Sequence, residues 1–142
     1  MNILLAEDDA DDRNFFYEAL EKLPISTSLT VAHDGEQLML HLSNEANTLP
    51  DVLFLDINMP RKDGLECLSE IKRDSRLKNI PVIIFSTSMS NDTVSQVFKS
   101  GATVYIHKPG EFTQLMQVIH HGLQIASGNV CSNEPLKYIL NA

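Results

Sequence analysis

Asp51-Val52-Leu53-Phe54-Leu55-Asp56 is the strongest structural signal in the chain. Four consecutive apolar residues between two acids are typical of a short strand that is buried on both faces of a sheet. Residues 57–64 follow with Pro60 and Gly64, a pattern that indicates a turn and the start of a helix. The stretch therefore predicts a buried strand with the carboxylate of Asp56 at its carboxyl end.

Three further apolar runs also end in polar side chains. In an open parallel sheet, a ligand binds beyond the carboxyl ends of the strands, so these polar groups are expected to share one site. The runs are residues 3–6, 82–85 and 104–106, and the polar residues that follow them are Glu7, Asp8, Asp9, Ser86, His107 and Lys108.

Between the apolar runs, hydrophobic residues recur at helical spacing, as in the segment that runs from Phe15 to Leu23. Asn91 or Asp92 is expected to cap the fourth helix, and Gly101 to end it. Strands that alternate with helices predict right-handed crossovers and an α/β fold, with a five-stranded parallel sheet covered on both faces. Residues 1–127 are expected to form this domain, and residues 128–142 a tail or an arm.

Size and charge exclude several classes of protein. The chain has 142 residues, enough for one domain, and a net charge of −8 with scattered basic residues, which argues against nucleic-acid binding. No apolar run approaches the roughly 20 residues that cross a bilayer, and the N-terminus lacks the pattern of a signal peptide. Cys67 and Cys131 lack metal-type spacing, so we expect two free thiols in a reducing cytoplasm.

Placing Glu7, Asp8 and Asp56 in one crevice has an electrostatic cost. Two carboxylates about 5 Å apart repel each other by roughly 3 kcal/mol at an effective dielectric constant near 20. Such a cluster favours a hard cation, and Mg²⁺ is typically bound by one or two carboxylates and a phosphate oxygen. With the acids neutralised, an aspartate can attack a phosphoryl group, and Lys108 and Ser86 could stabilise the phosphoryl oxygens.

The chain resembles the receiver domain of two-component response regulators, including stand-alone regulators related to chemotaxis and phytochrome-partner proteins. The resemblance covers about residues 2–127. It implies a flavodoxin-like (βα)5 fold with strand order 2-1-3-4-5, and phosphorylation by a histidine kinase or a phosphotransfer protein. The motifs that carry it are Glu7-Asp8, Asp56-x-x-Met59-Pro60-x-x-Asp63-Gly64, residues 81–86, Gly101-Ala102 and Lys108-Pro109.

The resemblance also implies a role for each matched residue. Asp56 would be the phosphoacceptor, Asp8 a direct Mg²⁺ ligand, and Glu7 a ligand through water. Lys108 would pair with the phosphoryl group, and the Lys108–Pro109 bond would be cis. The remaining roles are a main-chain carbonyl ligand from Asn58, a mobile hydroxyl from Ser86, a backbone donor from Thr87 and an aromatic switch at Tyr105.

Two positions depart from the family pattern. Ser86 replaces the commoner threonine and keeps the hydroxyl donor, whereas Gly110 stands where a large apolar residue often follows Lys-Pro. Asp9, Asp11 and Asp12 are assigned to the first turn of a helix, where negative charge is favoured, and not to the metal site.

Two alternatives to a phosphorylated signalling module remain open. The chain could be a pseudo-receiver that docks a partner without phosphorylation, although the complete acid, hydroxyl and lysine set argues against this. It could be a phosphatase with an aspartate nucleophile, but Asn58 occupies the place where a general acid would be required. Otherwise we expect a regulator that catalyses only its own phosphorylation and dephosphorylation. Apolar residues 136 and 138–140 suggest that the tail contributes to a homodimer.

Overall fold

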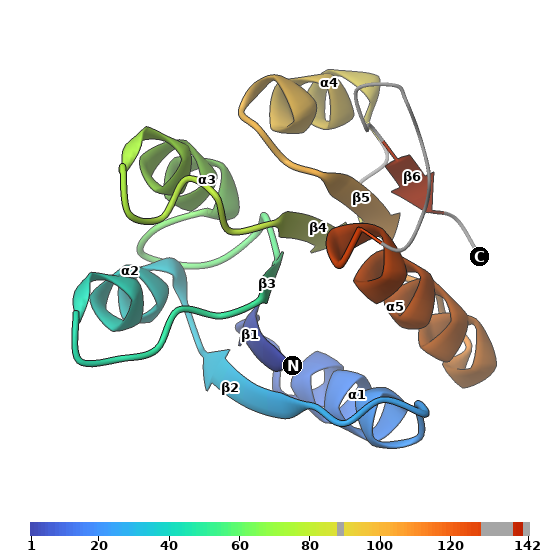
Figure 1. Cartoon of the computed structure of the whole chain (residues 1–142). Helices are drawn as coiled ribbons and strands as arrows, with labels where there is room; N and C mark the ends of the chain where they lie inside the picture. Colours follow the sequence, from blue (N-terminus) through green and yellow to red (C-terminus); the bar gives the residue numbers. More distant parts are fainter. Residues whose placement is uncertain (88–89, 129–137, 141–142) are drawn as a thin grey trace.

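A six-stranded sheet forms the centre of the computed structural model, which describes residues 1–87, 90–128 and 138–140 (Figure 1). The strand order is β2-β1-β3-β4-β5-β6, and every neighbouring pair is parallel. The strands are β1 (Asn2–Ala6), β2 (Ser28–Ala32), β3 (Val52–Leu55), β4 (Val82–Ser86), β5 (Val104–His107) and β6 (Tyr138–Leu140).

Helices cover both faces of this sheet. Figure 1 shows α1 and α5 on one face and α2, α3 and α4 on the other, and each group encloses its own hydrophobic cluster. The helices are α1 (Ala10–Glu21), α2 (Gly35–Ser43), α3 (Gly64–Arg73), α4 (Asn91–Lys99) and α5 (Phe112–Ala126). The predicted fold class and the order 2-1-3-4-5 of the first five strands are confirmed.

The β3 strand shows why the apolar runs form central strands. All four of its residues are buried, and successive side chains point to opposite faces of the sheet. Leu53 and Leu55 pack with α2, α3 and α4, whereas Val52 and Phe54 pack with α1 and α5. Asp56 follows directly and belongs to neither cluster, so its carboxylate lies at the carboxyl edge of the sheet.

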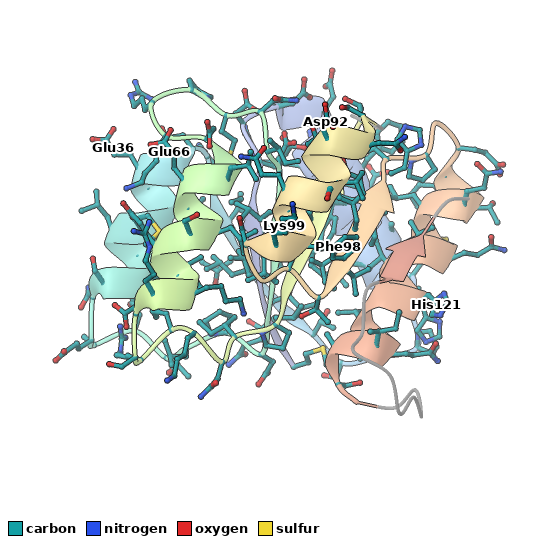
Figure 2. All side chains as sticks on the ribbon, turned by 90° about the horizontal axis from the view of Figure 1, so that it is seen from above. Glu36, Glu66, Asp92, Phe98, Lys99 and His121 are labelled. Carbon is teal, nitrogen blue, oxygen red and sulfur yellow. The ribbon has the colours of Figure 1, made fainter. Side chains whose placement is uncertain are left out.

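Acidic caps fix the starts of three helices at this edge. Asp9, Asp34 and Asp63 precede α1, α2 and α3, and each side chain accepts a hydrogen bond from the backbone N–H three residues later. The predicted cap of α4 is wrong, because the helix begins at Asn91 and Ser90 takes the cap position without a side-chain cap bond. Figure 2 shows Glu36 and Glu66, which lie in the first turns of α2 and α3, on the outer sides of these helices.

The C-terminal extension contributes a sixth strand that the sequence did not predict. β6 continues the sheet beyond β5, with Tyr105 opposite Ile139 in the parallel register. Cys131 and Leu136 lie outside the described residues, and the predicted homodimer and the domain boundary at residue 127 stay predictions. Within the part of the chain that the structure describes, no helix has the length and apolar character that a membrane crossing requires.

Gly64 allows a close approach between α3 and the end of β3, and this contact gives a prediction. A Cβ atom at Gly64 would lie 2.3 Å from the carbonyl oxygen of Asp56, whereas a Cβ at Gly110 would meet nothing within 4 Å. We expect Gly64→Ala to lower the free energy of unfolding by about 1–3 kcal/mol because the added methyl overpacks the backbone. Gly110→Ala should change it by less than about 0.5 kcal/mol.

Urea denaturation of both variants measures this difference. A Gly64→Ala protein as stable as the Gly110→Ala control would contradict the close packing of α3 against Asp56.

Candidate functional site

Glu7, Asp8 and Asp56 converge at the carboxyl edge of the sheet. Backbone bonds hold two of them, because Glu7 N donates to Ala32 O at 3.1 Å and Asp56 N donates to Ala6 O at 3.0 Å. Carboxylate oxygens of the three acids lie within 4.8 Å of one another, a grouping that could hold a metal ion. The structure therefore brings together the three carboxylates that the sequence predicted.

Among these acids, Glu7 is the one whose negative charge would most need a compensating positive charge. Its exposed fraction is 1%, and its Oε2 atom is buried without a hydrogen-bond partner. Burial, followed by the interaction with Asp56, raises the pKa of Glu7 to about 8, although Lys108 acts in the opposite direction. An unpaired buried carboxylate oxygen beside two further carboxylates fits the donor set of a hard divalent cation.

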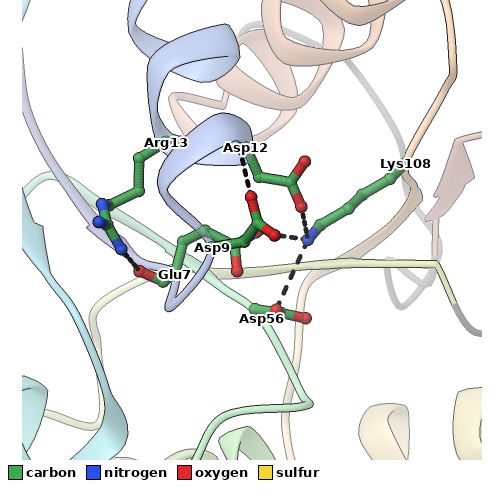
Figure 3. A network of polar contacts seen from close by, with 6 residues as sticks. All are labelled: Glu7, Asp9, Asp12, Arg13, Asp56 and Lys108. Atoms are coloured by element: carbon green, nitrogen blue, oxygen red, sulfur yellow. Dashed lines mark hydrogen bonds and ion pairs between the residues drawn. The ribbon is translucent and has the colours of Figure 1, made fainter.

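Lys108 supplies the positive charge at this site (Figure 3). Its ammonium group contacts Glu7, lies 3.0 Å from Asp12 Oδ2 and 3.5 Å from Asp56 Oδ2, and stands 5.4 Å from the centre of the Phe85 ring. Burial would lower the pKa of Lys108, but the hydrogen bond to Glu7 and the charges of Asp56 and Glu7 outweigh burial and raise it. Lys108 is therefore a permanent cation within reach of the predicted phosphoacceptor.

Asp12 is the residue of this network that sequence reasoning missed. The prediction placed it in the first turn of a helix, which is correct, but its side chain also contacts Lys108. The helix start explains this position, since Asp9 Oδ1 accepts from Asp12 N at 3.0 Å and fixes the first turn from which Asp12 reaches Lys108. The available signal was the aspartate at position 9, a cap residue that sets the helix phase.

Ser86, Thr87 and Tyr105 lie on the neighbouring strands. Ser86 ends β4 and is fully buried, and Thr87 follows it at the surface. The Thr87 carbonyl is 3.2 Å from Nε2 of His107, a contact that the sequence did not predict. Tyr105 is fully buried on β5, so its ring lies inward. The predicted roles of these residues in phosphate binding and switching stay predictions.

The predicted cis bond before Pro109 is wrong in this structure. No cis peptide bond is found among the described residues, so the Lys108–Pro109 bond is trans. Trans is the intrinsically favoured form even before proline, and the Lys108 side chain reaches Glu7, Asp12 and Asp56 from the trans backbone.

Asn58 lies in the loop that joins β3 to α3. Its side chain is exposed, and the next residue, Met59, is buried against the core. A hydrogen bond from Gly64 N to Ile57 O at 2.8 Å closes the base of the loop. This position, two residues after Asp56, is compatible with the predicted carbonyl ligand, and that role stays a prediction.

Comparison with known proteins agrees with this geometry. The family described as the response regulator receiver domain matches residues 3–120. The chain belongs to this family. It is 33% identical over 121 residues to the response regulator Rcp1 of Synechocystis sp., and the aligned region covers 82% of each chain. Receiver-domain relatives such as Rcp1 act as response regulators in two-component signalling.

Two solved structures are close neighbours of this receiver domain. The Mn²⁺-bound form of the response regulator Rcp1 has a TM-score of 0.82 at 30% identity and covers 94% of this chain and 99% of its own. The phosphorylated cyanobacterial phytochrome response regulator RcpA also has a TM-score of 0.82, at 32% identity, and covers 94% and 98%.

The raised pKa of Glu7 predicts a pH dependence of stability in metal-free protein. Between about pH 4.5 and 8, the folded carboxyl holds a proton that the unfolded chain releases. Folding then takes up a proton, so the contribution of Glu7 to stability falls as the pH rises through this window. We expect Glu7→Gln to flatten the dependence, as measured by urea denaturation with a chelator at several pH values. An identical slope for both proteins would contradict a raised pKa.

The ion pairs of Lys108 predict a large effect of removing its charge. Above about pH 8, where Glu7 is ionised, Lys108→Met leaves the buried carboxylates without compensation and should lower the metal-free free energy of unfolding by about 3 kcal/mol. Lys62→Met is the control, because Lys62 pairs with Glu70 at the surface, where an ion pair contributes about 0–1 kcal/mol. Thermal or urea unfolding compares the two, and equal losses would show that Lys108 does not neutralise the cluster.

Proposed function

We propose that this protein is a two-component response regulator in which Asp56 accepts a phosphoryl group. The observation that carries this proposal is the position of the Asp56 carboxylate, which lies among two other acids and 3.5 Å from the ammonium group of Lys108. The phosphoryl donor would be the phosphohistidine of a sensor histidine kinase or a phosphotransfer protein. Membership of the receiver family supports this choice of donor.

The residues at the site suit Mg²⁺. Asp8, Asp56 and the main-chain carbonyl of Asn58 would bind the ion, and Glu7 would bind it through water. The unpaired Oε2 atom of Glu7 supports this assignment. When bound, Mg²⁺ would neutralise the acids and offset charge on the phosphoryl oxygens.

The residues of the chain would then position the transfer. One oxygen of Asp56 attacks phosphorus, the bond between phosphorus and the donor imidazole nitrogen breaks, and the imidazole leaves with the electron pair of that bond. Lys108 moves its contact from Asp12 and Glu7 to a phosphoryl oxygen. The Ser86 hydroxyl and the Thr87 N–H donate to the other oxygens. Hydrolysis of the acyl phosphate by water would reset the protein.

The β4 and β5 strands would transmit the effect of phosphorylation from the site to the surface of the protein. Ile84 pairs with Tyr105, and Ser86 pairs with His107, so Ser86 and Tyr105 are near neighbours on adjacent strands. A movement of the Ser86 side chain would therefore affect the Tyr105 ring. Two arrangements of these side chains would change the surface formed by α4 and β5, and hence the affinity for a protein partner. We further propose that the chain turns over no separate substrate.

Phosphorylation by a small donor tests this function. Incubation with acetyl phosphate and Mg²⁺ should add the mass of one phosphoryl group, and Asp56→Asn should abolish the addition because the nucleophile is lost. Asp51→Asn is a matched control, because Asp51 directly precedes the same strand at its opposite end, away from the site. Its side chain accepts a hydrogen bond from Asn2 N.

Intact-mass spectrometry gives the readout. A wild-type protein that gains no phosphoryl group, or an Asp56→Asn variant that still gains one, would contradict the assignment of Asp56.

A further inference from the structure

The loop from Ile57 to Gly64 contains a strained turn centred on Arg61. Arg61 has a φ of 67°, and among the described residues no other residue except glycine has a positive φ. Lys62 N donates to Pro60 O at 2.7 Å, an i to i+2 bond that closes a three-residue γ-turn around Arg61. A non-glycine residue persists in this conformation only where its surroundings determine it, and such residues cluster at functional sites.

An ion pair with a buried carboxylate holds this turn. Arg61 Nη1 lies 2.8 Å from Oδ2 of Asp34, whose exposed fraction is 4%. The other oxygen, Oδ1, accepts from Gln37 N at 2.8 Å and caps α2. Each carboxylate oxygen of Asp34 therefore has one partner, so the start of α2 and the turn are tied through a single side chain. Glu36 is a weaker neighbour, 3.8 Å from Arg61 Nε, and Figure 2 shows it on the outside of α2.

A backbone contact supports the same turn from the adjacent residue. A Cβ atom at Gly35 would lie 2.0 Å from the carbonyl oxygen of Lys62, so the first residue of α2 touches the loop directly. The loop is thus braced against α2 at two consecutive positions. Its base is closed separately by the bond between Gly64 and Ile57. Asn58, the proposed carbonyl ligand, lies between these two fixed regions together with Met59 and Pro60.

We infer that Arg61 and Asp34 form a positioning pair, which sets the 57–64 loop so that the Asn58 carbonyl meets the divalent cation. This inference rests on the proposed function and concerns residues that do not themselves touch the ion. Glycine would adopt the same backbone angle without strain, but it would lose the ion pair. Strain at the turn and the bond to Asp34 therefore act together to fix the loop.

Arg61→Gly separates positioning from stability. Glycine relieves the strain of the turn but gives up the ion pair with Asp34, so the two effects oppose each other and the urea midpoint should stay close to that of the wild type. The Mg²⁺ dissociation constant, measured by isothermal titration calorimetry, should rise about tenfold, as for other residues that orient a metal ligand from outside the coordination sphere. A role limited to stability would not produce this combination.

Asp34→Asn tests the pair from the other side. Asparagine also caps helices well, so α2 should keep its cap while the charge on the carboxylate is lost. We expect a similar weakening of Mg²⁺ binding, and no further weakening in the Arg61→Gly/Asp34→Asn double variant, because both changes break one interaction. Glu36→Gln is the control and should bind Mg²⁺ like the wild type.

The possible results separate this inference from the proposed function. Wild-type protein that does not bind Mg²⁺ would overturn both. Wild-type binding that disappears in Asp8→Asn, together with unchanged binding in Arg61→Gly and Asp34→Asn, would overturn the positioning pair alone. Mg²⁺ affinity that falls only in step with a lower urea midpoint would also overturn it, because general loosening would then explain the loss.

Discussion

The crowding of carboxylates at the ends of β1 and β3 is the constraint on which the rest of this structure depends. The acids cannot move apart, because the backbone of Asp56 bonds to Ala6 and that of Glu7 to Ala32, while Arg13 donates to the Glu7 carbonyl at 3.0 Å. Sheet formation therefore forces carboxyl groups together, in a place where Glu7 is almost fully buried and keeps its proton up to about pH 8 in the metal-free protein. Lys108 offsets part of this repulsion, and the unpaired Glu7 oxygen leaves a position suited to a divalent cation.

The elements around the acids act as supports of different kinds. On one side, the first turn of α1 brings Asp12 to Lys108, so that the ammonium group is shared among Glu7, Asp12 and Asp56. On the other side, the turn at Arg61 is tied to the start of α2. The strands between them are buried and continuous, which suits a site whose geometry must be rigid while one hydroxyl and one lysine change contacts. In this account, binding, transfer and switching use the same sheet edge.

Much of this arrangement could be predicted because each strand leaves a simple mark in the sequence. An apolar run that stops at a polar residue locates a strand end, which is why Asp56, Ser86 and Lys108 were placed correctly. The contact between Asp12 and Lys108 could not be read in this way, since positions 8, 9, 11 and 12 are all aspartates and only the helix phase distinguishes them. The trans bond before Pro109 depends on a small energy difference that local sequence does not determine. Pairing of β6 with β5 and the turn at Arg61 depend on long-range contacts.

Anomalous diffraction from crystals soaked in Mn²⁺ tests the central claim most directly. We predict one strong peak at the carboxyl edge of the sheet, bounded by the carboxylates of Asp8 and Asp56, with Glu7 behind them and the Asn58 carbonyl among its ligands. A peak elsewhere, or no peak while the three acids keep the positions described above, would contradict the claim that this cluster is a cation site.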